Sequence, residues 1–452
     1  MPTDGLSVLA CSLRAGGCSP VVWKRQCVRT WILAITTPTT ECGIFSLKRC
    51  SIGHRRRLPM PPDDVHPGPP ERRYTVVYLI DGLGMGGAER LMVPLLRHLD
   101  RERFVPHVGV LQVRADNPME REIRSLGVPV TRLPVERLRD LTALPRLLRF
   151  LRGVEADVVH TQLEFANILG NLAARILRLP SVCTAHVLLT EERRLKTRLH
   201  EAVEWAVLRF FCDQVIAVSD EARRQYLERK RLAPEKVTTL YNGIDLVPFT
   251  DLDRSDARRA VRRELGIPLE ARVLITVAVL RPPKGIRFMI RALPDVLRRV
   301  EDAFYLIVGD GPDREALVEV ADEAGVRERV VFAGMRDDVP RLLAAGDVFV
   351  LPTLSEALPT VLAEAMASRL PVVASAVGGV PQMVDEGVNG LLVPPGDSQA
   401  LARACLSLLT DPARRAEMGQ AGWEIVQRKF DVRRQVRALE ELYIRFLRAY
   451  GR

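Results

Sequence analysis

The stretch VLPTLSEALPTVLAEAMASRLPVVASAVGGVP, from Val350 to Pro381, has the pattern of a buried strand, a helix and a second buried strand. Two carboxylates lie inside this apolar segment, Glu356 and Glu364, eight residues apart. The run VFVLPT predicts the first strand, LSEAL the turn, and PTVLAEAMA a helix with Pro359 at its first position, where a missing N–H costs nothing. We therefore expect Glu356 at the carboxyl end of a strand and Glu364 in the second helical turn, close enough to bind one ligand.

The turn between these acids offers hydrogen-bond donors for an anion. The N-terminus of a helix has unpaired N–H groups and a partial positive charge, which suit a phosphate. Pro359 removes one such donor and leaves the N–H groups near Leu358 and Thr360. Because carboxylates beside an anion site must face hydroxyl groups, the expected ligand is a ribose or hexose attached to a diphosphate.

A second loop in the same half of the chain carries two cations. The segment LRPPKG (280–285) directly follows a predicted strand. Arg281 and Lys284 on this turn are expected to project into a cleft between two domains, where they suit a diphosphate leaving group. The alternative is a solvated loop, since lysine and arginine are common there.

Short β-branched runs alternate with longer helical patterns twice along the chain. The predicted strands are 75–80, 107–113, 156–160, 181–186 and 214–219 in the first half, and 272–280, 304–311, 329–334, 348–353 and 371–375 in the second. Runs that are apolar on both faces need helices on both sides of the sheet. The sequence therefore predicts an α/β fold of two doubly wound, Rossmann-like domains facing a central cleft, at 71–248 and 272–431, joined by a linker at 249–271.

Charge and cysteine concentrate before the first predicted strand. Residues 1–73 hold 11 Lys and Arg against 5 Asp and Glu, which leaves 55 against 51 in the rest of a chain of net charge +10. The predicted domains are thus only mildly basic, which argues against a nucleic-acid partner. Residues 1–70 show no hydrophobic period and end in a proline-rich segment, so we expect an irregular leader that is either disordered or the result of a misassigned start. No apolar run reaches the length of a membrane-spanning helix.

The three cysteines within the predicted domains, Cys183, Cys212 and Cys405, have the apolar surroundings of core residues. The five earlier ones lack the CxxC spacing of a zinc site.

A glycine-rich turn follows the first predicted strand. In DGLGMGGAER, Gly82, Gly84 and Gly87 have the G-x-G-x-x-G spacing of a dinucleotide site. A nicotinamide enzyme would need an acid at the end of the second strand, and the sequence has Arg114 there. Two interpretations stay open: a backbone site for an anion at the helix N-terminus, and a tight turn without a ligand.

The pair Glu356 and Glu364, E-x7-E, together with LRPPKG, IVGDGP, GGAER and GGVPQMVDEGVNGLLVPPGD, resembles the retaining glycosyltransferases of family 4, which have the GT-B fold. The resemblance covers residues 75 to about 450. It implies that Glu356 contacts hydroxyls of the donor sugar, and that Glu364 holds the ribose of the nucleotide. It also implies that Arg281 and Lys284 bind the diphosphate, and that the helix at 432–452 packs back on the first domain.

Further donor contacts follow from the same resemblance. Backbone in IVGDGP and VVFAG, including Gly309 and Gly334, would line the base pocket, and Gly86 with Gly87 of GGAER would face the donor. The chain departs from many relatives at two positions, with Ala357 and Arg369 where glycine is frequent.

Two histidines and an asparagine are candidates in the first domain. His186 ends a predicted strand at the position where relatives place a histidine near the reacting sugar, although a lone histidine there can also be a core group. His160 ends the preceding strand and, with Asn167, is expected on the acceptor side.

The resemblance predicts a hexosyltransferase that moves a sugar from a nucleotide diphosphate sugar to a glycan or lipid-linked acceptor, with retention of anomeric configuration. The rivals are a GT-B sugar-nucleotide epimerase and a non-catalytic nucleotide-binding scaffold. We expect no cofactor and no metal, because the one D-x-D triplet, Asp251 to Asp253, falls in the polar linker.

The expected location is the cytoplasm. The basic and apolar segment 191–211 is either a surface for peripheral contact with the inner face of a membrane or an amphipathic helix packed on the first sheet.

Overall fold

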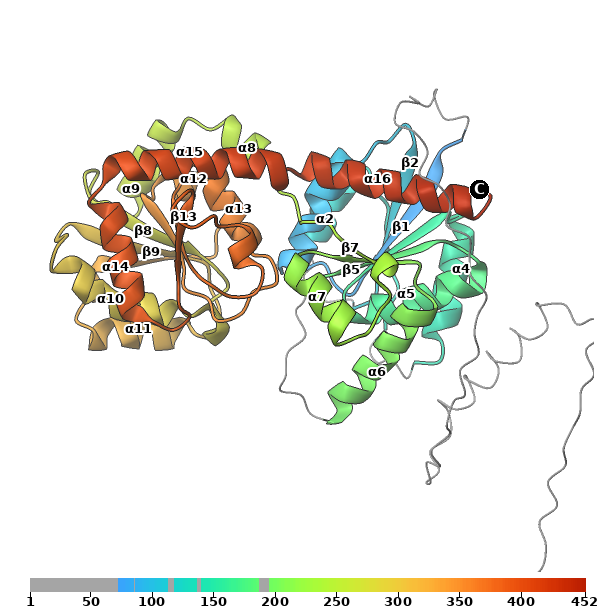
Figure 1. Cartoon of the computed structure of the whole chain (residues 1–452). Coiled ribbons are helices and arrows are strands. Elements are labelled where there is room, and N and C mark those ends of the chain that lie inside the picture. The colour runs from blue at the N-terminus through green and yellow to red at the C-terminus, as the bar shows by residue number, and fades with distance from the viewer. Residues whose placement is uncertain (1–71, 85, 113–117, 136–139, 187–194) are drawn as a thin grey trace, which may run out of the picture. The chain divides into compact units, whose positions relative to one another are not determined.

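The computed structural model of the protein describes residues 72–84, 86–112, 118–135, 140–186 and 195–452 (Figure 1). The predicted leader at 1–70 lies outside these residues, as do Arg114 and the first residues of the 191–211 segment. The described residues form two parallel sheets, each covered by helices on both faces.

The first sheet has seven strands within the described residues, in the order β3-β2-β1-β4-β5-β6-β7. Its strands are β1 (Tyr74–Ile80), β2 (Phe104–Val110), β3 (Val130–Arg132), β4 (Val158–Gln162), β5 (Ser181–Ala185), β6 (Gln214–Ala217) and β7 (Val237–Thr239). Its helices are α2 (Gly87–His98), α3 (Pro118–Ser125), α4 (Ala143–Gly153), α5 (Glu164–Leu177), α6 (Leu195–Phe210) and α7 (Asp220–Glu228), with the 3-10 turn η1 (Pro234–Lys236).

The second sheet has six described strands, in the order β10-β9-β8-β11-β12-β13. Its strands are β8 (Arg272–Val277), β9 (Ala303–Val308), β10 (Val330–Gly334), β11 (Val348–Leu351), β12 (Val372–Ser375) and β13 (Gly390–Val393). The remaining helices are α8 (Val247–Thr250), α9 (Arg254–Glu264), α10 (Ile286–Leu297), α11 (Arg314–Glu323), α12 (Val339–Ala344), α13 (Thr360–Ala367), α14 (Ser398–Leu409), α15 (Pro412–Lys429) and α16 (Val432–Ala449). The 3-10 turns are η2 (Pro282–Lys284), η3 (Arg327–Arg329) and η4 (Val380–Gln382).

Alternation of side chains along each strand explains the layers. In β1, Val76, Tyr78 and Ile80 pack with α2 and α16, whereas Val77 and Leu79 pack with α4 and α5. In β8 the residues Val273, Ile275 and Val277 face α12, α13 and α15, and Leu274 faces α10 and α14. Both faces of the central strands, such as β1 and β8, are buried, which is why these strands read as continuous apolar runs. The predicted pair of doubly wound sheets is confirmed.

Each sheet reverses its strand order at one place. In the first sheet this place lies between β1 and β4, and in the second between β8 and β11. Ligands of open α/β sheets bind outside the carboxyl ends of the strands at such a reversal. The loops after β8 and β11 are those that carry the predicted cations and acids.

The structure adds elements that the sequence pattern did not predict. Strands β3, β7 and β13 have only three or four residues each, too few for a period-2 pattern to stand out. Strand β2 starts at Phe104, three residues before the predicted start, because Pro106 interrupts the apolar run without ending the strand. The stretch 249–271, predicted as a linker, contains α9, whose Val261 belongs to the core of the second lobe.

Helix α16 packs against the first sheet. Its buried residues Val436, Leu439 and Tyr443 belong to the same core as β1 and β2. The chain crosses between the lobes twice, before α8 and before α16, and the two crossings pair with each other at Ile244 and Asp431. A side chain at Gly243 would lie 2.4 Å from the Cα of Val432, so only glycine lets the crossings approach this closely.

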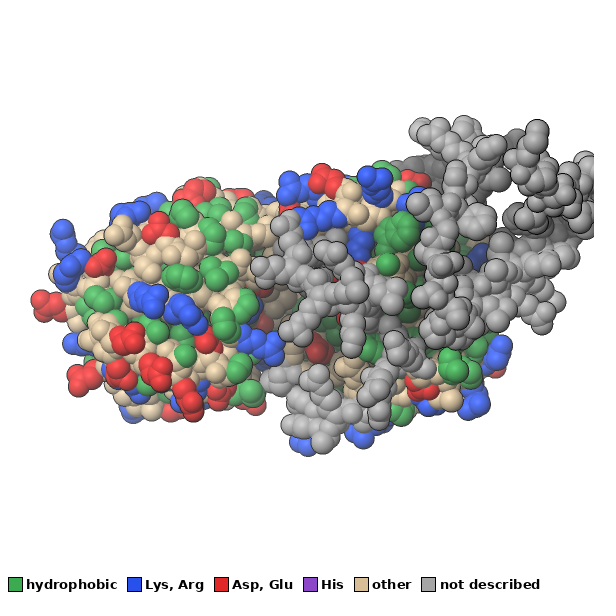
Figure 2. Space-filling view, turned by 90° about the horizontal axis from the view of Figure 1, so that it is seen from below, with side chains coloured by type: hydrophobic (Ala, Val, Ile, Leu, Met, Phe, Trp, Pro, Cys, Tyr) green, Lys and Arg blue, Asp and Glu red, His purple; other side chains and the backbone are tan. Residues whose placement is uncertain are grey.

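Cys183, Cys212 and Cys405 are buried free thiols, which confirms their prediction as core residues. Positive and negative side chains are interspersed over the described part of the face in Figure 2. Within the described residues, no helix combines the length and the apolar composition that crossing a bilayer requires.

Candidate active site

The loops after β8 and β11 are joined by hydrogen bonds. The N–H of Leu354 donates to the carbonyl of Pro283 at 2.8 Å, and the hydroxyl of Thr353 donates to the same carbonyl at 3.0 Å. Gly285, at φ 65°, lies so close to Pro352 that a Cβ would be 1.9 Å from the Pro352 carbonyl oxygen. A glycine is therefore required in LRPPKG both for its backbone conformation and for this contact.

Lys284 and Glu356, 72 residues apart in sequence, meet across these two loops. The Lys284 ammonium lies 2.5 Å from Glu356 Oε1, and the side chains are 29% and 12% exposed. The hydroxyl of Thr353 is 3.4 Å from the same carboxylate oxygen. Two residues predicted from separate motifs thus form one partly buried charged cluster.

Arg281 is the exposed N-cap residue of η2, three residues before Lys284 in the same loop. In the part of the chain that the structure describes, its guanidinium has no hydrogen bond or ion pair. Its charge is therefore available to a ligand at the carboxyl ends of β8 and β11.

Glu364 is half-buried on α13, the helix that follows Glu356. Burial raises the pKa of its carboxyl, and the charge of Arg90, on α2 of the other lobe, offsets part of the rise. Among the described residues, no side chain or backbone group donates a hydrogen bond to it. A half-buried carboxyl without a donor is suited to accept hydrogen bonds from the hydroxyls of a ligand.

Helix α13 begins one residue later than predicted, at Thr360, and Pro359 is its N-cap with ψ 107°. Leu358 is buried and Thr360 half-buried. Since the first-turn N–H groups of a helix have no helical acceptor, the N–H groups of Thr360 and Val361 are placed for an anion, next to that of Leu358.

Two further glycine loops approach this region through their backbones. Gly309 follows β9 with φ 128°, and a Cβ there would be 1.9 Å from the carbonyl oxygen of Ala278. Its N–H donates to the carbonyl of Gly334 at 2.8 Å, which ties the ends of β9 and β10 together. Gly379, after β12, is held against Ala357, where a Cβ would be 2.0 Å from the carbonyl oxygen. These contacts leave no room for side chains, so the backbone itself lines this edge of the sheet.

In the first lobe, His186 follows β5 and is half-buried. Its Nε2 lies 3.0 Å from Oε1 of Gln162, the last residue of β4. Burial lowers the pKa of His186 to about 4, so the imidazole is neutral near pH 7. Gln162 fixes one ring nitrogen and thereby orients the ring.

Asp81, at the carboxyl end of β1, is a buried carboxyl at this edge of the first sheet. It is 8% exposed and accepts the N–H groups of Phe165 and Ala166, at 3.0 and 2.7 Å, from the first turn of α5. Burial raises its pKa to about 6, although these two hydrogen bonds lower it. Leu163, between β4 and α5, has φ 71°, a conformation that costs free energy in any residue but glycine.

His160 lies in the core and not at the surface. It is 1% exposed, with Nδ1 2.5 Å from the Tyr443 hydroxyl and Nε2 2.7 Å from the Thr184 hydroxyl. Burial, and secondarily the charge of His186, lower its pKa to about 3. Both ring nitrogens contact protein hydroxyls, so His160 is a core residue and the prediction that it lies on the acceptor side is wrong.

Asn167 has a similar environment. It is 3% exposed, accepts from the Thr161 hydroxyl at 3.0 Å and donates to Glu204 at 3.2 Å. Its side chain therefore joins β4, α5 and α6, and it too is left out of the proposed site.

The glycine-rich turn ends at Gly86, the N-cap of α2, and Gly87 is exposed. The carboxylate of Glu89 folds back over Gly86, where a Cβ would be 2.2 Å from Glu89 Oε2. An acid of the helix itself thus covers this helix N-terminus, and an anion would have to displace it.

The sequence argument missed Asp81, Gln162, Thr353 and Arg90. Asp81 and Gln162 each follow a predicted strand, and polar residues at that position could have been used as a signal. Thr353 is the last residue of the predicted strand 348–353 and could have been found in the same way, whereas Arg90 gave no such signal, since Glu364 lies far from it in the chain. Among the described residues, no three His, Cys, Asp or Glu side chains gather as a metal ion requires.

Two doubly wound lobes, with charged residues at the carboxyl ends of their strands, define a GT-B protein. Comparison with known families agrees: residues 85–247 match the family described as Glycosyltransferase Family 4, and residues 271–411 match Glycosyl transferases group 1. The chain belongs to this family and is a glycosyltransferase of the GT-B fold.

Curated relatives span most of the described chain. The 2-deoxystreptamine glucosyltransferase of Streptomyces kanamyceticus is 30% identical over 346 residues, which is 70% of this chain and 87% of the relative. The Escherichia coli UDP-Gal:alpha-D-GlcNAc-diphosphoundecaprenol alpha-1,3-galactosyltransferase is 26% identical over 72% of this chain and 85% of its own.

Solved structures give the same fold. Anabaena HepE in complex with UDP has a TM-score of 0.73 at 26% identity, over 81% of this chain and 99% of its own. WaaG, a glycosyltransferase involved in lipopolysaccharide biosynthesis, has a TM-score of 0.66 at 19% identity, over 82% and 99%.

Proposed function

We propose that this glycosyltransferase transfers a hexose from a nucleoside diphosphate sugar to a glycan or lipid-linked acceptor, with retention of configuration at the anomeric carbon. The observation that carries the proposal is the pairing of Lys284 with Glu356 at the strand-order reversal of the second sheet. Arg281 and Glu364 follow the same two strands and have no side-chain partner among the described residues. Cations that suit a diphosphate and carboxylates that suit sugar hydroxyls therefore lie together at the carboxyl ends of β8 and β11.

The diphosphate is the leaving group, so charge develops on it as the bond to the sugar breaks. Arg281, Lys284 and the N–H groups of Leu358 and Thr360 stabilise that charge without moving far, because loop contacts already hold them. An ammonium has three donors, so Lys284 can keep Glu356 while it donates to a phosphate oxygen. Glu356 accepts from hydroxyls of the sugar, and Glu364 accepts from the ribose.

The base lies against backbone near Gly309 and Gly334, and the neutral His186 faces the reacting sugar from the other lobe. Support for a nucleotide sugar comes from HepE, whose structures hold UDP and UDP-glucose at 26% identity. Support for a lipid-linked acceptor comes from the name of the Escherichia coli relative. The proposed place of action is the cytoplasm, with the acceptor reached at the inner face of a membrane if it is lipid-linked.

Turnover by the purified protein tests the proposal. The protein is incubated with UDP-glucose, UDP-galactose or GDP-mannose, and released nucleotide, free sugar and transferred sugar are measured separately. Transfer, or slow hydrolysis of one donor without an acceptor, supports the proposal, and proton NMR of the product reads the anomeric configuration. Epimerised donor without transfer would make the protein an epimerase, and nucleotide binding without turnover of any donor would make it a scaffold. An inverted anomeric configuration would overturn the retaining mechanism alone.

A further inference from the structure

An arginine with a left-handed backbone lies at the amino edge of the second sheet. Arg369 follows α13 with φ 53°, and the N–H groups of Arg369 and Leu370 close the helix on Met366 and Ala365 at 2.9 and 3.1 Å. Glycine is the usual residue at such a helix end because it adopts this conformation without strain. The chain accepts a backbone cost at this position and gains a guanidinium.

That guanidinium has a defined place. Its central carbon lies 5.1 Å from the centre of the Trp423 ring, on α15. A Cβ at Gly419, one turn earlier on α15, would be 2.2 Å from the Arg369 carbonyl oxygen, so the helix presses directly on this peptide. Side chain and backbone of Arg369 are therefore both fixed by α15.

A second arginine, Arg254, lies within electrostatic range of Arg369. Arg254 is the first residue of α9, and its Nε is buried without a hydrogen bond. Burial lowers the pKa of Arg254, and the charges of Arg369 and then Arg258 lower it further. Among the described residues, neither Arg254 nor Arg369 forms an ion pair with a carboxylate.

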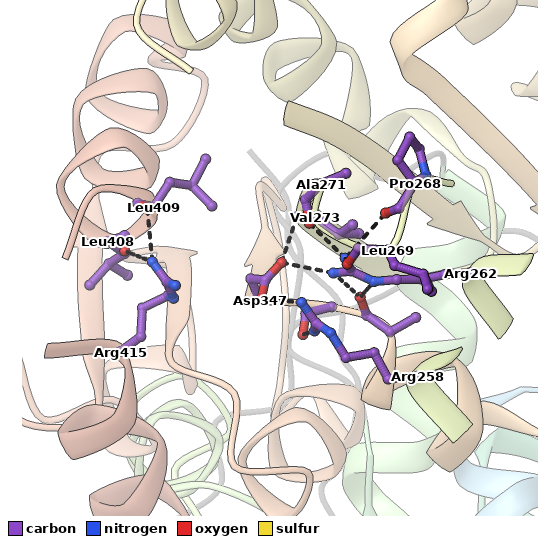
Figure 3. Close-up of polar contacts among 12 residues, drawn as sticks. Arg258, Arg262, Pro268, Leu269, Ala271, Val273, Asp347, Leu408, Leu409 and Arg415 are labelled. Carbon is purple, nitrogen blue, oxygen red and sulfur yellow. Dashed lines mark hydrogen bonds and ion pairs between the residues drawn. The ribbon is translucent and has the colours of Figure 1, made fainter. Parts of the chain in front are cut away.

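The acids near this cluster are already engaged. Asp347 accepts from Arg258 at 2.8 Å on one oxygen, and on the other from Arg262 at 2.9 Å and from the N–H of Val273 at 2.8 Å (Figure 3). Asp253 caps α9 by accepting the N–H of Asp256 at 3.0 Å, and the Asp256 carboxylate pairs with Arg259.

We propose that Arg254 and Arg369, beside Trp423, bind a phosphate-bearing anion at a site separate from the donor site. Arginine presents several N–H donors in a plane that fits phosphate oxygens. Bound anion would neutralise the two cations and accept the buried Nε–H, which no described protein group does.

The new site and the donor site lie at opposite edges of the sheet. Arg369 precedes β12, whereas Glu356 follows β11, which runs parallel to β12. Four residues of strand, roughly 13 Å, separate the two edges. The ligand is expected to be small and dissolved, because the buried Nε of Arg254 cannot reach a flat surface.

Thermal unfolding with inorganic phosphate tests the site, with sodium chloride at matched ionic strength as the reference. At about 10 mM phosphate we expect the midpoint of the wild-type chain to rise by about 2–4 °C. Arg369→Gly should abolish the rise without harming the fold, since glycine suits φ 53°. Arg178→Gly is the matched control, because Arg178 also ends a helix with φ 56°, in the first lobe, and this variant should keep the full rise.

Two further variants distinguish phosphate binding at this site from phosphate binding at the donor site. Arg254→Gln should lose the response like Arg369→Gly, and Lys284→Ala should keep it. An equal rise in wild type, Arg369→Gly and Arg254→Gln would overturn the proposal, and so would loss of the rise in Lys284→Ala alone. The proposal would also be wrong if the wild type neither showed a rise with phosphate nor bound the vesicles described below.

The second probe is sedimentation with phosphatidylcholine vesicles that contain phosphatidic acid. Binding to these vesicles that needs Arg369, without a response to dissolved phosphate, would assign the site to a lipid headgroup instead of a dissolved ligand.

Discussion

Glu356 and Glu364 have different environments although they belong to one motif. Glu356 is paired with Lys284 at 2.5 Å, whereas Glu364 has no partner among the described residues and has a pKa raised by burial. The difference fits different ligand groups: Glu356, held by a cation proposed to bind the diphosphate, accepts from hydroxyls of the sugar, and Glu364 accepts from those of the ribose.

This difference gives a first prediction. Glu364→Gln should weaken UDP about 10- to 100-fold, because a charged acceptor of a ribose hydroxyl is lost. Glu356→Gln should leave UDP affinity within about threefold and lower turnover, because it frees Lys284 for phosphate but removes a sugar contact. Calorimetric titration with UDP measures the first effect and donor consumption the second. Equal losses of UDP affinity in both variants would refute the division of roles.

Asp81 shows how burial makes one carboxyl sensitive to pH. Its pKa of about 6 in the folded chain lies above the ordinary value of 3.8, so the folded state binds the proton more tightly than the unfolded state. Stability contributed by this group is therefore present at low pH and is lost as pH rises from about 4 to 6.

The second prediction follows from this sign. Asp81→Asn removes the titration and keeps an oxygen that can accept from the α5 amides. Between pH 4 and 6 the free energy of unfolding of the variant should therefore fall less than that of wild type, and the difference should reach up to about 3 kcal/mol. Urea unfolding at several pH values measures the slope. Asp140→Asn is the control: hydrogen bonds from Thr142 lower the pKa of Asp140, so its titration lies below this range. An unchanged slope in Asp81→Asn would show that Asp81 is not buried as described.

At the scale of elements, α9 shows why a charged sequence can still be core. Helix α9 has five arginines among its eleven residues, a composition that is typical of a solvated linker. Nevertheless, Arg262 is 0% exposed. Its guanidinium donates to the carbonyls of Ala345 and Ala271 and to Asp347, which fixes α9 to the start of β11 (Figure 3). The sequence could not reveal this, because Ala345 and Asp347, which accept hydrogen bonds from Arg262, lie more than 80 residues away in the chain. Only the carbonyls of Pro268, Leu269 and Ala271 are close in sequence.

Arg262→Met should destabilise the second lobe by roughly 2–4 kcal/mol, because buried carbonyls lose their donor and Asp347 loses one of its cations. Arg259→Met, on the same helix, should change stability by no more than about 0.5 kcal/mol, since its pair with Asp256 is exposed. The midpoints of urea unfolding compare the two. Equal effects would mean that Arg262 contributes packing and no specific hydrogen bonding.

For the whole molecule, the central question is whether turnover needs a metal ion. Asp253 caps α9 and Asp251 follows α8, so the D-x-D triplet serves helix ends between the lobes. Arg281, Lys284 and the N-terminus of α13 offer the positive charge that a metal would otherwise bring to the leaving group.

We predict that the transfer rate in excess EDTA stays within about twofold of the untreated rate. Asp251→Asn with Asp253→Asn should be nearly silent, because asparagine is also a good helix cap. Lys284→Ala should cost roughly 2–4 kcal/mol of transition-state stabilisation, as the loss of one preorganised donor does. Abolition by EDTA with rescue by magnesium or manganese would refute the metal-free mechanism.

The two doubly wound lobes could be predicted from the amino-acid sequence, because strands buried on both faces leave continuous apolar runs at α/β spacing. It also determined which loops carry the charged groups, since Arg281, Lys284 and Glu356 each follow a strand in the chain. These are local properties, and a local pattern suffices to predict them.

Which of these groups contact one another follows from the folded chain and could not be predicted. Lys284 pairs with Glu356 across 72 residues, and Tyr443 buries His160 across 283 residues, which turned an acceptor-side candidate into a core residue. The pairing of Trp423 with Arg369 and the burial of Arg254 Nε likewise depend on how α15 and α9 pack. Burial and charge pairing arise between distant segments, so the order of residues along the chain does not contain them until the chain has folded.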